Sequence, residues 1–272
     1  MKTKFSVLMS VYYKENPIYL DKALESIFSQ TIIPNEVILV EDGKLTKELD
    51  NIISKYTSKY KKIMQVIKFS ENRGLGKALH DGLLKCSNEI VFRMDSDDIS
   101  SPNRFEKTLE VFSEMNVDVV GGNIAEYDGE MKNITGYRVV PSSNEKIIKM
   151  MKKRNAMNHV TVAYKKDKVI EAGNYLVMPY FEDYYLWVRM LKNNCVFHNL
   201  NECLVNVRCG NEMIKRRGGL IYIKHIAHFE WSIYKIKFIG LSMCIINIFE
   251  RVLISIVPNN IRAFIYKYIL RK

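Results

Sequence analysis

The stretch EIVFRMDSDDISSP, residues 89–102, joins an apolar run to three closely spaced acids. Residues 90–94 have the character of a buried strand, and Asp95, Asp97 and Asp98 follow within four positions. Carboxylates this close repel one another and raise one another's pKa, so a folded chain tolerates them where a cation, a helix N-terminus or other donors offset the charge. We therefore expect a positive group at the end of this strand.

Apolar runs alternate with helical patterns from the N-terminus up to this strand. Strands are expected at 4–13, 35–43, 63–70 and 89–95, and helices at 18–31, 47–60 and 74–86. Strands of continuous apolar character separated by helices predict a parallel sheet that is covered on both faces. Ligands of such sheets bind at the carboxyl ends of the strands, so the residues there are candidates for a site.

Polar residues stand at three of these strand ends. Asp42 follows the apolar run VILV, Asp95 follows IVFRM, and Asn72-Arg73-Gly74 lies beyond the third strand. Asp95 and Asp97 suit Mg²⁺ or Mn²⁺, which prefers oxygen ligands and leaves positions open for a diphosphate. Structural alternatives remain, because Asp42 is also a turn residue and Asp98 is also a candidate N-cap of a helix that begins near Pro102.

Composition indicates one folded domain with room for a small addition. The chain has 272 residues, of which 47% are apolar and 26% are charged, enough for one sizeable core. Its five cysteines include no CxxC pair, and the N-terminus lacks a signal-peptide pattern. A reducing cytoplasm is the expected location.

The net charge of +11 is concentrated in an apolar tail, residues 231–272. There Glu250 is the only acid beside seven basic residues: Lys235, Lys237, Arg251, Arg262, Lys267, Arg271 and Lys272. The uncharged run 238–249 is too short to span a bilayer, so we expect a helix lying on an anionic membrane surface. A buried or partner-binding helix is the alternative. Nucleic acid is not an expected partner, because the basic residues do not interleave with exposed aromatics.

Six segments together resemble a known family. The chain is similar, over roughly residues 4–210, to the family 2 inverting glycosyltransferases with the GT-A fold, and most of all to amylovoran-type bacterial polysaccharide and O-antigen transferases. The segments are FSVLMSVYYKENPIYLDKALESIFSQT, EVILVEDG, ENRGLGKALHDGL, FRMDSDDISSPNRFEK, NHVTVAYKK and YFEDYYLWVRML.

The resemblance implies the fold and its division. A GT-A domain, with a Rossmann-like mixed α/β sheet flanked by helices, is expected over residues 1–230. Residues 1–100 are expected to form its nucleotide-sugar half and residues 101–230 its acceptor half. An amphipathic helical, membrane-associating tail is expected at 231–272.

The resemblance also implies roles on the donor side. Ser10 and Tyr12 would contact the uridine, with the Tyr12 ring available to stack on the base. Asp42 would accept the uracil imide hydrogen, and Arg73 would approach the nucleotide or its phosphates. Asp95 would reach the ribose or the metal, Asp97 would be the principal metal ligand, and Asp98 is left structural.

On the acceptor side the resemblance points to Asp183 as the base. Inverting transfer needs a group that takes the acceptor's proton, and a carboxylate whose pKa is raised by burial and by neighbouring Glu182 suits that task. Glu182 is expected near the acceptor. The alternative is that both acids only cap the helix that follows them.

Further residues are expected at the site with open alternatives. Asn158 and His159 match a family position near the acceptor, although His159 is equally a candidate structural hydrogen-bond partner. Arg216 and Arg217, before two glycines, would clamp the diphosphate or form a solvated basic turn. His225 and His228 share a helix face without another ligand nearby in sequence, so they are interpreted as non-metal residues.

The predicted function is that of a metal-dependent inverting glycosyltransferase. It would use Mn²⁺ or Mg²⁺ to transfer a hexose, galactose or glucose in β linkage, from a UDP-sugar to a glycan on an undecaprenyl-diphosphate-type lipid. The protein would be peripheral to the cytoplasmic face of the inner membrane, in surface polysaccharide biosynthesis. The alternatives are a nucleotidyltransferase, which should carry a Gly-rich basic loop where this chain has VYYKENP, and a non-catalytic assembly subunit.

Overall fold

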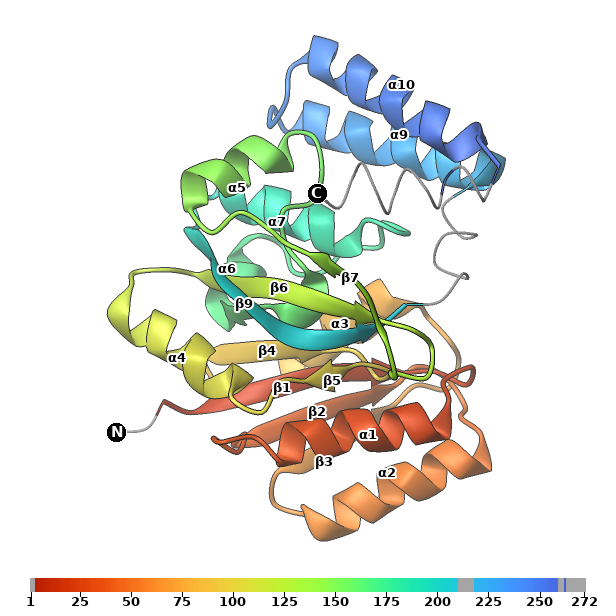
Figure 1. The fold of residues 1–272 in the computed structure, drawn as a ribbon, viewed down its shortest axis with the longest axis vertical. Helices are drawn as coiled ribbons and strands as arrows, with labels where there is room; N and C mark the ends of the chain where they lie inside the picture. Colours follow the sequence, from red (N-terminus) through yellow and green to blue (C-terminus); the bar gives the residue numbers. More distant parts are fainter. Residues whose placement is uncertain (1–2, 210–217, 259–261, 263–272) are drawn as a thin grey trace.

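The computed structural model describes residues 3–209, 218–258 and 262, and shows a mixed sheet with helices on both faces (Figure 1). The sheet has nine strands, ordered β3-β2-β1-β4-β8-β6-β9-β5, and β7 pairs with β6 outside this path. The expected Rossmann-like mixed sheet is confirmed. Arg216 and Arg217 lie outside the described residues.

The first half of the sheet is parallel. Strands β1 (Phe5–Val11), β2 (Glu36–Glu41), β3 (Met64–Lys68) and β4 (Ile90–Met94) alternate with helices α1 (Pro17–Phe28), α2 (Lys47–Lys59) and α3 (Leu75–Lys85). Every residue of β2 and β4 is buried, as expected for central strands with helices on both faces. All seven elements lie where the apolar pattern predicted them.

The second half of the sheet reverses direction beside β4. Strand β8 (Ala163–Lys165) is antiparallel to both β4 and β6 (Val119–Tyr127). Strand β9 (Phe197–Arg208) runs parallel to β6 and also pairs with the short β5 (Ile99–Ser100), while β7 (Ile134–Arg138) forms an outer hairpin with β6. The acidic loop 95–98 therefore connects the two halves of the sheet.

Two apolar cores cover the two faces. Phe5, Val7 and Met9 of β1 point into a core with α1, α2 and α4 (Arg104–Glu114), while Leu8 points into the opposite core. That opposite core holds α3, α5 (Asn144–Met151), α6 (Lys166–Glu171) and α7 (Glu182–Lys192). A 3₁₀ turn, His159–Thr161, lies against the sheet. The strict alternation along β1 shows that one register sets both cores.

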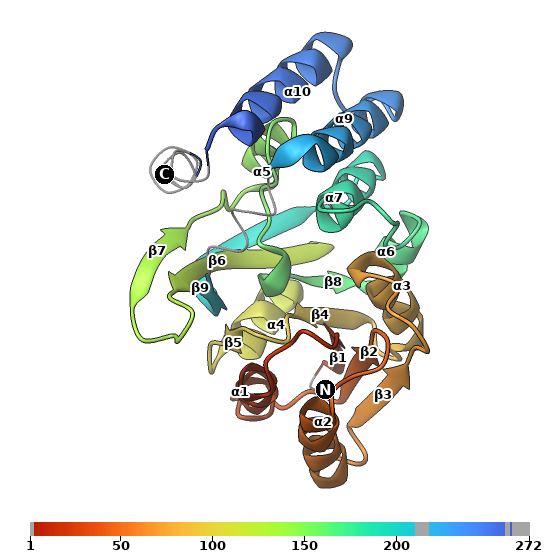
Figure 2. The ribbon, with the colours of Figure 1, turned by 90° about the vertical axis from the view of Figure 1, so that its right-hand side faces the viewer.

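The C-terminal helices form a hairpin above α5 and α7. Helices α9 (Gly219–Lys235) and α10 (Leu241–Ile256) lie side by side in both views (Figures 1 and 2). Helix α9 buries Tyr222, Ile226 and Phe229 against the α7 side of the core. The boundary expected at residue 230 falls inside α9. Among the described residues, no helix is both long and apolar enough to cross a membrane.

Candidate active site

The ends of β1, β2 and β4 meet at one edge of the sheet. Met9 of β1 is paired with Met94 of β4, and Val11 of β1 is paired with Glu41 of β2. Ser10, Asp42 and Asp95 are therefore neighbours in space at the carboxyl edge, as the strand pattern predicted. This edge is where ligands of a doubly wound sheet bind.

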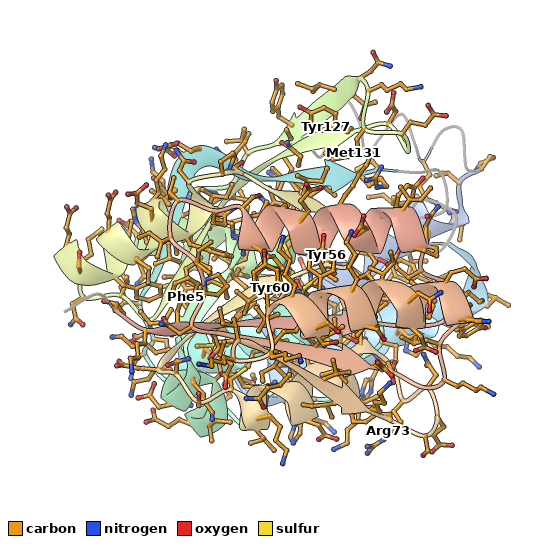
Figure 3. The ribbon with its side chains drawn as sticks, turned by 90° about the horizontal axis from the view of Figure 1, so that it is seen from below. Phe5, Tyr56, Tyr60, Arg73, Tyr127 and Met131 are labelled. Carbon is orange, nitrogen blue, oxygen red and sulfur yellow. The ribbon has the colours of Figure 1, made fainter. Side chains whose placement is uncertain are left out.

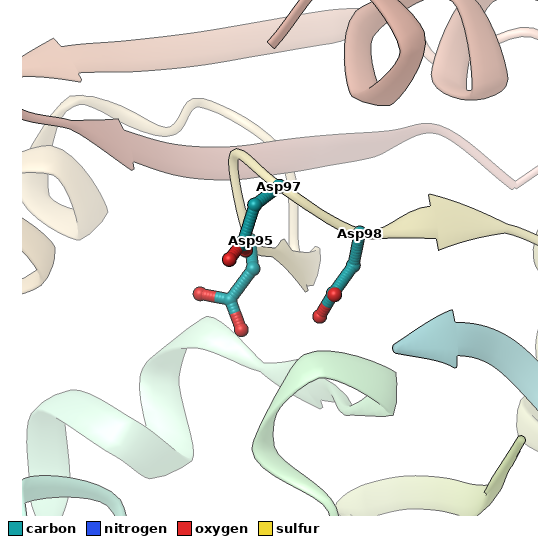
Figure 4. Close-up of side chains that lie close together, drawn as sticks. All are labelled: Asp95, Asp97 and Asp98. Atoms are coloured by element: carbon teal, nitrogen blue, oxygen red, sulfur yellow. The ribbon is translucent and has the colours of Figure 1, made fainter. Parts of the chain in front are cut away.

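Three carboxylates gather directly after β4. Asp95, Asp97 and Asp98 can each place one oxygen so that all three lie within 4.8 Å of one another (Figure 4). A set of hard oxygen donors at this spacing fits a divalent cation such as Mg²⁺ or Mn²⁺. Asp98, expected to be only structural, thus belongs to the same cluster as the two predicted metal ligands.

Burial and mutual repulsion oppose the charge on this cluster. Burial, the neighbouring charge of Asp95 and that of Glu15 raise the pKa of Asp97 to about 7. Burial together with Asp97 and Asp95 raises the pKa of Asp98 well above its ordinary value. The cluster is therefore under electrostatic strain that a bound cation would relieve.

Two arginines hold the cluster in place. Arg93, inside β4 and only 2% exposed, forms an ion pair with Asp95. The backbone N–H of Arg208 donates to Asp98 Oδ1 at 2.8 Å, and Arg208 Nε donates to the carbonyl oxygen of Asp97 at 2.9 Å. The positive group expected beside the acids thus includes protein side chains. The N-cap alternative for Asp98 is wrong, because the N-cap of α4 is Asn103.

Asp42 organises the loop beyond β3. Its Oδ1 accepts the N–H of Arg73 at 2.7 Å, and its Oδ2 accepts the N–H of Gly74 at 2.9 Å. Gly43 permits this approach, because a Cβ there would lie 2.6 Å from the nitrogen of Asn72. Asp42 therefore has a structural role whatever it does for a ligand. The Arg73 guanidinium pairs with Asp81 and lies over the Phe69 ring, near the edge of the molecule in Figure 3.

Asp183 lies in the first turn of α7, on the face of the sheet that α3, α5 and α6 also cover. Asn155 Nδ2 donates to Asp183 Oδ2 at 2.7 Å. Burial raises the pKa of Asp183, and the N–H of Tyr184, Asn155 and the cations Arg138 and Arg93 oppose that rise. Burial, reinforced by Asp183, raises the pKa of Glu182 to about 7. Neither side chain caps α7 from its N-cap position, which Phe181 occupies.

The two residues expected near the acceptor are held by the protein. Asn158 Nδ2 donates to the carbonyl oxygens of Gly122 and Arg138, and Asn158 Oδ1 accepts from Arg138 Nη1. His159 Nε2 lies 3.0 Å from the hydroxyl of Tyr175. Burial and the nearby Arg93 cation lower the pKa of His159 well below its usual value, so its ring is neutral.

The remaining predicted residues differ in their surroundings. Tyr12 is 38% exposed, and its ring lies in an edge-to-face arrangement with that of Tyr13, with 5.9 Å between the ring centres. The His225 ring lies against Tyr180, and the metal-type clusters among the described residues do not include His225 or His228. The interpretation of these two histidines as non-metal residues stays a prediction.

Besides Arg208, sequence reasoning missed four residues that shape this site. Arg93 was visible as a charge inside an apolar strand, and Glu15, which accepts the Ser96 hydroxyl hydrogen, lies in the loop after β1. Glu41 Oε1 is buried without a hydrogen-bond partner among the described residues, beside Asp42. Asn155 carries no pattern of its own, and only the fold brings it to Asp183.

Comparison with known proteins gives consistent matches. The model described as Glycosyl transferase family 2 matches residues 6–171. The Escherichia coli UDP-Gal:alpha-D-GlcNAc-diphosphoundecaprenol beta-1,3-galactosyltransferase is 37% identical over 99% of this chain and 97% of its own length. The Amylovoran biosynthesis glycosyltransferase of Erwinia amylovora is 35% identical over 97% of this chain and 98% of its own.

A solved structure supports the fold. TarS of S. aureus, in a fragment complexed with UDP-GlcNAc, has a TM-score of 0.64 and 20% identity, covering 84% of this chain and 66% of that one. Together with the family match, this confirms the expected GT-A-like fold. The expected likeness to amylovoran-type and O-antigen transferases is also confirmed.

Replacing Asp97 by Asn should stabilise the protein when divalent cations are removed with EDTA. A carboxyl whose folded pKa is about 7, above the ordinary value of about 3.9, destabilises the fold as pH rises between those values. At pH 8 the penalty is fully present in the wild type and absent in Asp97→Asn. The variant should therefore have the higher melting temperature, measured by differential scanning fluorimetry.

With Mn²⁺ in place of EDTA, the wild type should have a higher melting temperature than Asp97→Asn. Mn²⁺ should raise the melting temperature of the wild type and leave that of Asp97→Asn unchanged, while Asp21→Asn, in a surface ion pair with Lys55, should respond like the wild type. An Asp97→Asn variant that Mn²⁺ stabilises as strongly as the wild type would rule out Asp97 as a ligand.

Proposed function

The chain belongs to glycosyl transferase family 2 and is a glycosyltransferase, and on that premise we propose that it transfers a hexose from a UDP-sugar, with inversion, to a lipid-diphosphate-linked glycan. The observation that carries the proposal is the acidic cluster of Asp95, Asp97 and Asp98 at the carboxyl edge of the sheet. The similar E. coli protein is named for a UDP-Gal donor and a diphosphoundecaprenol acceptor.

The donor nucleotide would bind across the ends of β1 and β2. Tyr12 is 38% exposed and would stack its ring on the uracil, and Ser10 stands one strand away from Asp95. Asp42 already accepts two backbone N–H groups, so an imide hydrogen would use its remaining lone pairs. Arg73 would have to leave Asp81 to reach a phosphate.

Asp95 and Asp97 would hold Mn²⁺ or Mg²⁺, with Asp98 close enough to contribute. When bound, that ion would neutralise charge on the diphosphate as it leaves. Arg216 and Arg217, outside the described residues, are proposed to clamp the same diphosphate. Arg93 keeps Asp95 oriented toward the cluster through its ion pair.

Asp183 would act as the general base. The acceptor hydroxyl oxygen attacks the anomeric carbon, the bond from that carbon to the diphosphate oxygen breaks, and Asp183 takes the hydroxyl proton. A raised pKa makes the carboxylate a stronger base, and the hydrogen bond from Asn155 fixes one of its oxygens. Glu182, with its pKa near 7, would contact the acceptor sugar.

Asn158 and His159 would support the acceptor side indirectly. The Asn158 amide is bound to the backbone of β6 and β7, so it would shape the acceptor site by holding these strands. His159 is neutral beside Tyr175, and it would act as an uncharged hydrogen-bonding group.

The acceptor lipid and the outer face of α10 fit a membrane surface. Leu241, Ile245, Phe249, Leu253 and Ile256 repeat at helical spacing along α10, and each is at least 45% exposed. Exposed Lys235 ends α9, and exposed Lys237 lies in the connection from α9 to α10. An exposed apolar stripe beside basic residues is typical of a helix that lies in a membrane interface. We propose that the enzyme works at the cytoplasmic face of the inner membrane, in surface polysaccharide biosynthesis.

Replacing Asp183 by Asn should separate binding from turnover. Because Asp183 acts on the acceptor proton, Asp183→Asn should keep the wild-type affinity for UDP-galactose with Mn²⁺ and lower kcat by at least about 100-fold. Asp97→Ala should instead lose the Mn²⁺-dependent affinity. Calorimetric titration and a radiolabelled transfer assay measure the two properties. Equal loss of affinity in both variants would contradict these separate roles.

Replacing Ile245 and Phe249 together by Ser should weaken binding to anionic vesicles. These side chains are 59% and 64% exposed, so the change removes apolar contact with lipid at little cost to the fold. Sedimentation with phosphatidylglycerol vesicles should show at least about 10-fold weaker partitioning. The control, Val139→Ser with Val177→Ser, removes exposed apolar residues elsewhere and should bind like the wild type. Unchanged binding of the α10 variant would exclude this face as the membrane contact.

A further inference from the structure

A buried polar cluster joins the two C-terminal helices. Glu230 of α9 is fully buried, and its Oε1 lies 3.0 Å from Arg251 Nε of α10. Asn247, one turn before Arg251 on α10, donates from Nδ2 to Glu230 Oε2 at 3.0 Å. The cluster therefore fixes α10 against α9 with one orientation.

The same two α10 side chains also hold the chain that follows α5. Arg251 Nη2 donates to the carbonyl oxygen of Lys153 at 2.8 Å, and Asn247 Nδ2 donates to that of Lys152 at 2.9 Å. Two successive carbonyl groups are thus fixed by α10. A third tether comes from the sheet, where Arg138 Nη2 donates to the carbonyl oxygen of Asn155 at 2.7 Å.

Arg251 also contacts the start of α7. Its guanidinium lies 5.7 Å from the ring centre of Phe181 and 5.6 Å from that of Tyr184. Phe181 and Tyr184 flank Glu182 and Asp183, and the hydroxyl of Tyr184 donates to the carbonyl oxygen of Met151. Arg251 therefore contacts the chain after α5, which carries Asn155, and the start of α7, which carries Asp183. The hydrogen bond between Asn155 and Asp183 joins these two segments.

The energetics of the cluster argue for a role beyond stability. A buried ion pair gains little over well-packed apolar side chains, because removing both charges from water offsets their attraction. Burial raises the pKa of Glu230, which shows that its charge is costly where it stands. An apolar pair at positions 230 and 251 could join the two helices, but it could not donate a hydrogen bond to the Lys153 carbonyl.

We propose that Arg251, oriented by Glu230, is a positioning residue for Asp183, so that the C-terminal helical hairpin is part of the catalytic apparatus. The inference rests on the proposed role of Asp183 as the base. Arg251 holds the Lys153 carbonyl from α10, next to the Lys152 carbonyl held by Asn247; this fixes Asn155, and Asn155 fixes the Asp183 carboxylate. A base displaced by a fraction of an ångström loses rate without losing substrate.

The decisive variants are Arg251→Met and the apolar pair Glu230→Met with Arg251→Met. Both should lower kcat by at least about 10-fold while the KM for the UDP-sugar stays within about twofold. Arg251→Lys, which keeps a charge able to reach Glu230, should recover part of kcat. Should Arg251→Met fold poorly, the apolar pair carries the test, because it leaves no unpaired buried charge.

A double-mutant cycle with Asn155→Ala tests whether Arg251 affects Asp183 through Asn155. If Arg251 acts through Asn155, adding Arg251→Met to Asn155→Ala should cost less than about twofold more in kcat. The control is Lys166→Met, which removes a donor to the carbonyl oxygen of Cys86 far from Asp183, and it should keep wild-type kcat.

The outcomes are distinguishable. Unchanged kcat in the apolar pair, or losses that multiply in the double mutant, would overturn the positioning role while leaving the proposed function intact. A wild-type protein with no transfer, or an Asp183→Asn variant with full transfer, would instead overturn the proposed function itself.

Discussion

Arg93 supplies the positive charge around which the two halves of the site are arranged. Its guanidinium is buried inside β4 and pairs with Asp95; it opposes the rise that burial causes in the pKa of Asp183, and it adds to the effect of burial in lowering the pKa of His159. A second buried cation, Arg104, lies behind it and donates to the carbonyl oxygen of Arg93; burial and Arg93 together lower the pKa of Arg104 to about 9. The acidic cluster of this fold is thus partly balanced from within the sheet before any ligand arrives.

The parallel half of the sheet could be predicted from sequence because its signals are local. The apolar runs of β1, β2 and β4 and the helical spacing of α1 and α3 each lie within one segment, and strand ends of a parallel sheet meet by geometry. The half beyond β4 could not be predicted in this way. Asn155 meets Asp183, and Asp98 meets Arg208, only after strands distant in sequence have paired.

Some residues that were predicted to bind ligands also stabilise the fold. Asp42 holds the loop at Arg73 and Gly74, and Asn158 holds β6 to β7. Arg251 follows Glu250 in the sequence, but its ion pair is with Glu230 of α9. Helix α10 thus turns one face toward the segments around Asp183 and leaves an apolar face exposed, so one helix connects the proposed base with the proposed membrane contact.

The most direct test of this account is the stereochemistry of the transfer. The protein should be incubated with UDP-galactose, Mn²⁺ and a lipid carrying N-acetylglucosamine on a diphosphate, and the product examined by proton NMR. We predict stoichiometric release of UDP and a galactosyl residue whose anomeric coupling is that of a β linkage. An α-linked product, or a UDP-sugar that is hydrolysed without transfer to the lipid acceptor, would contradict the proposed inverting mechanism.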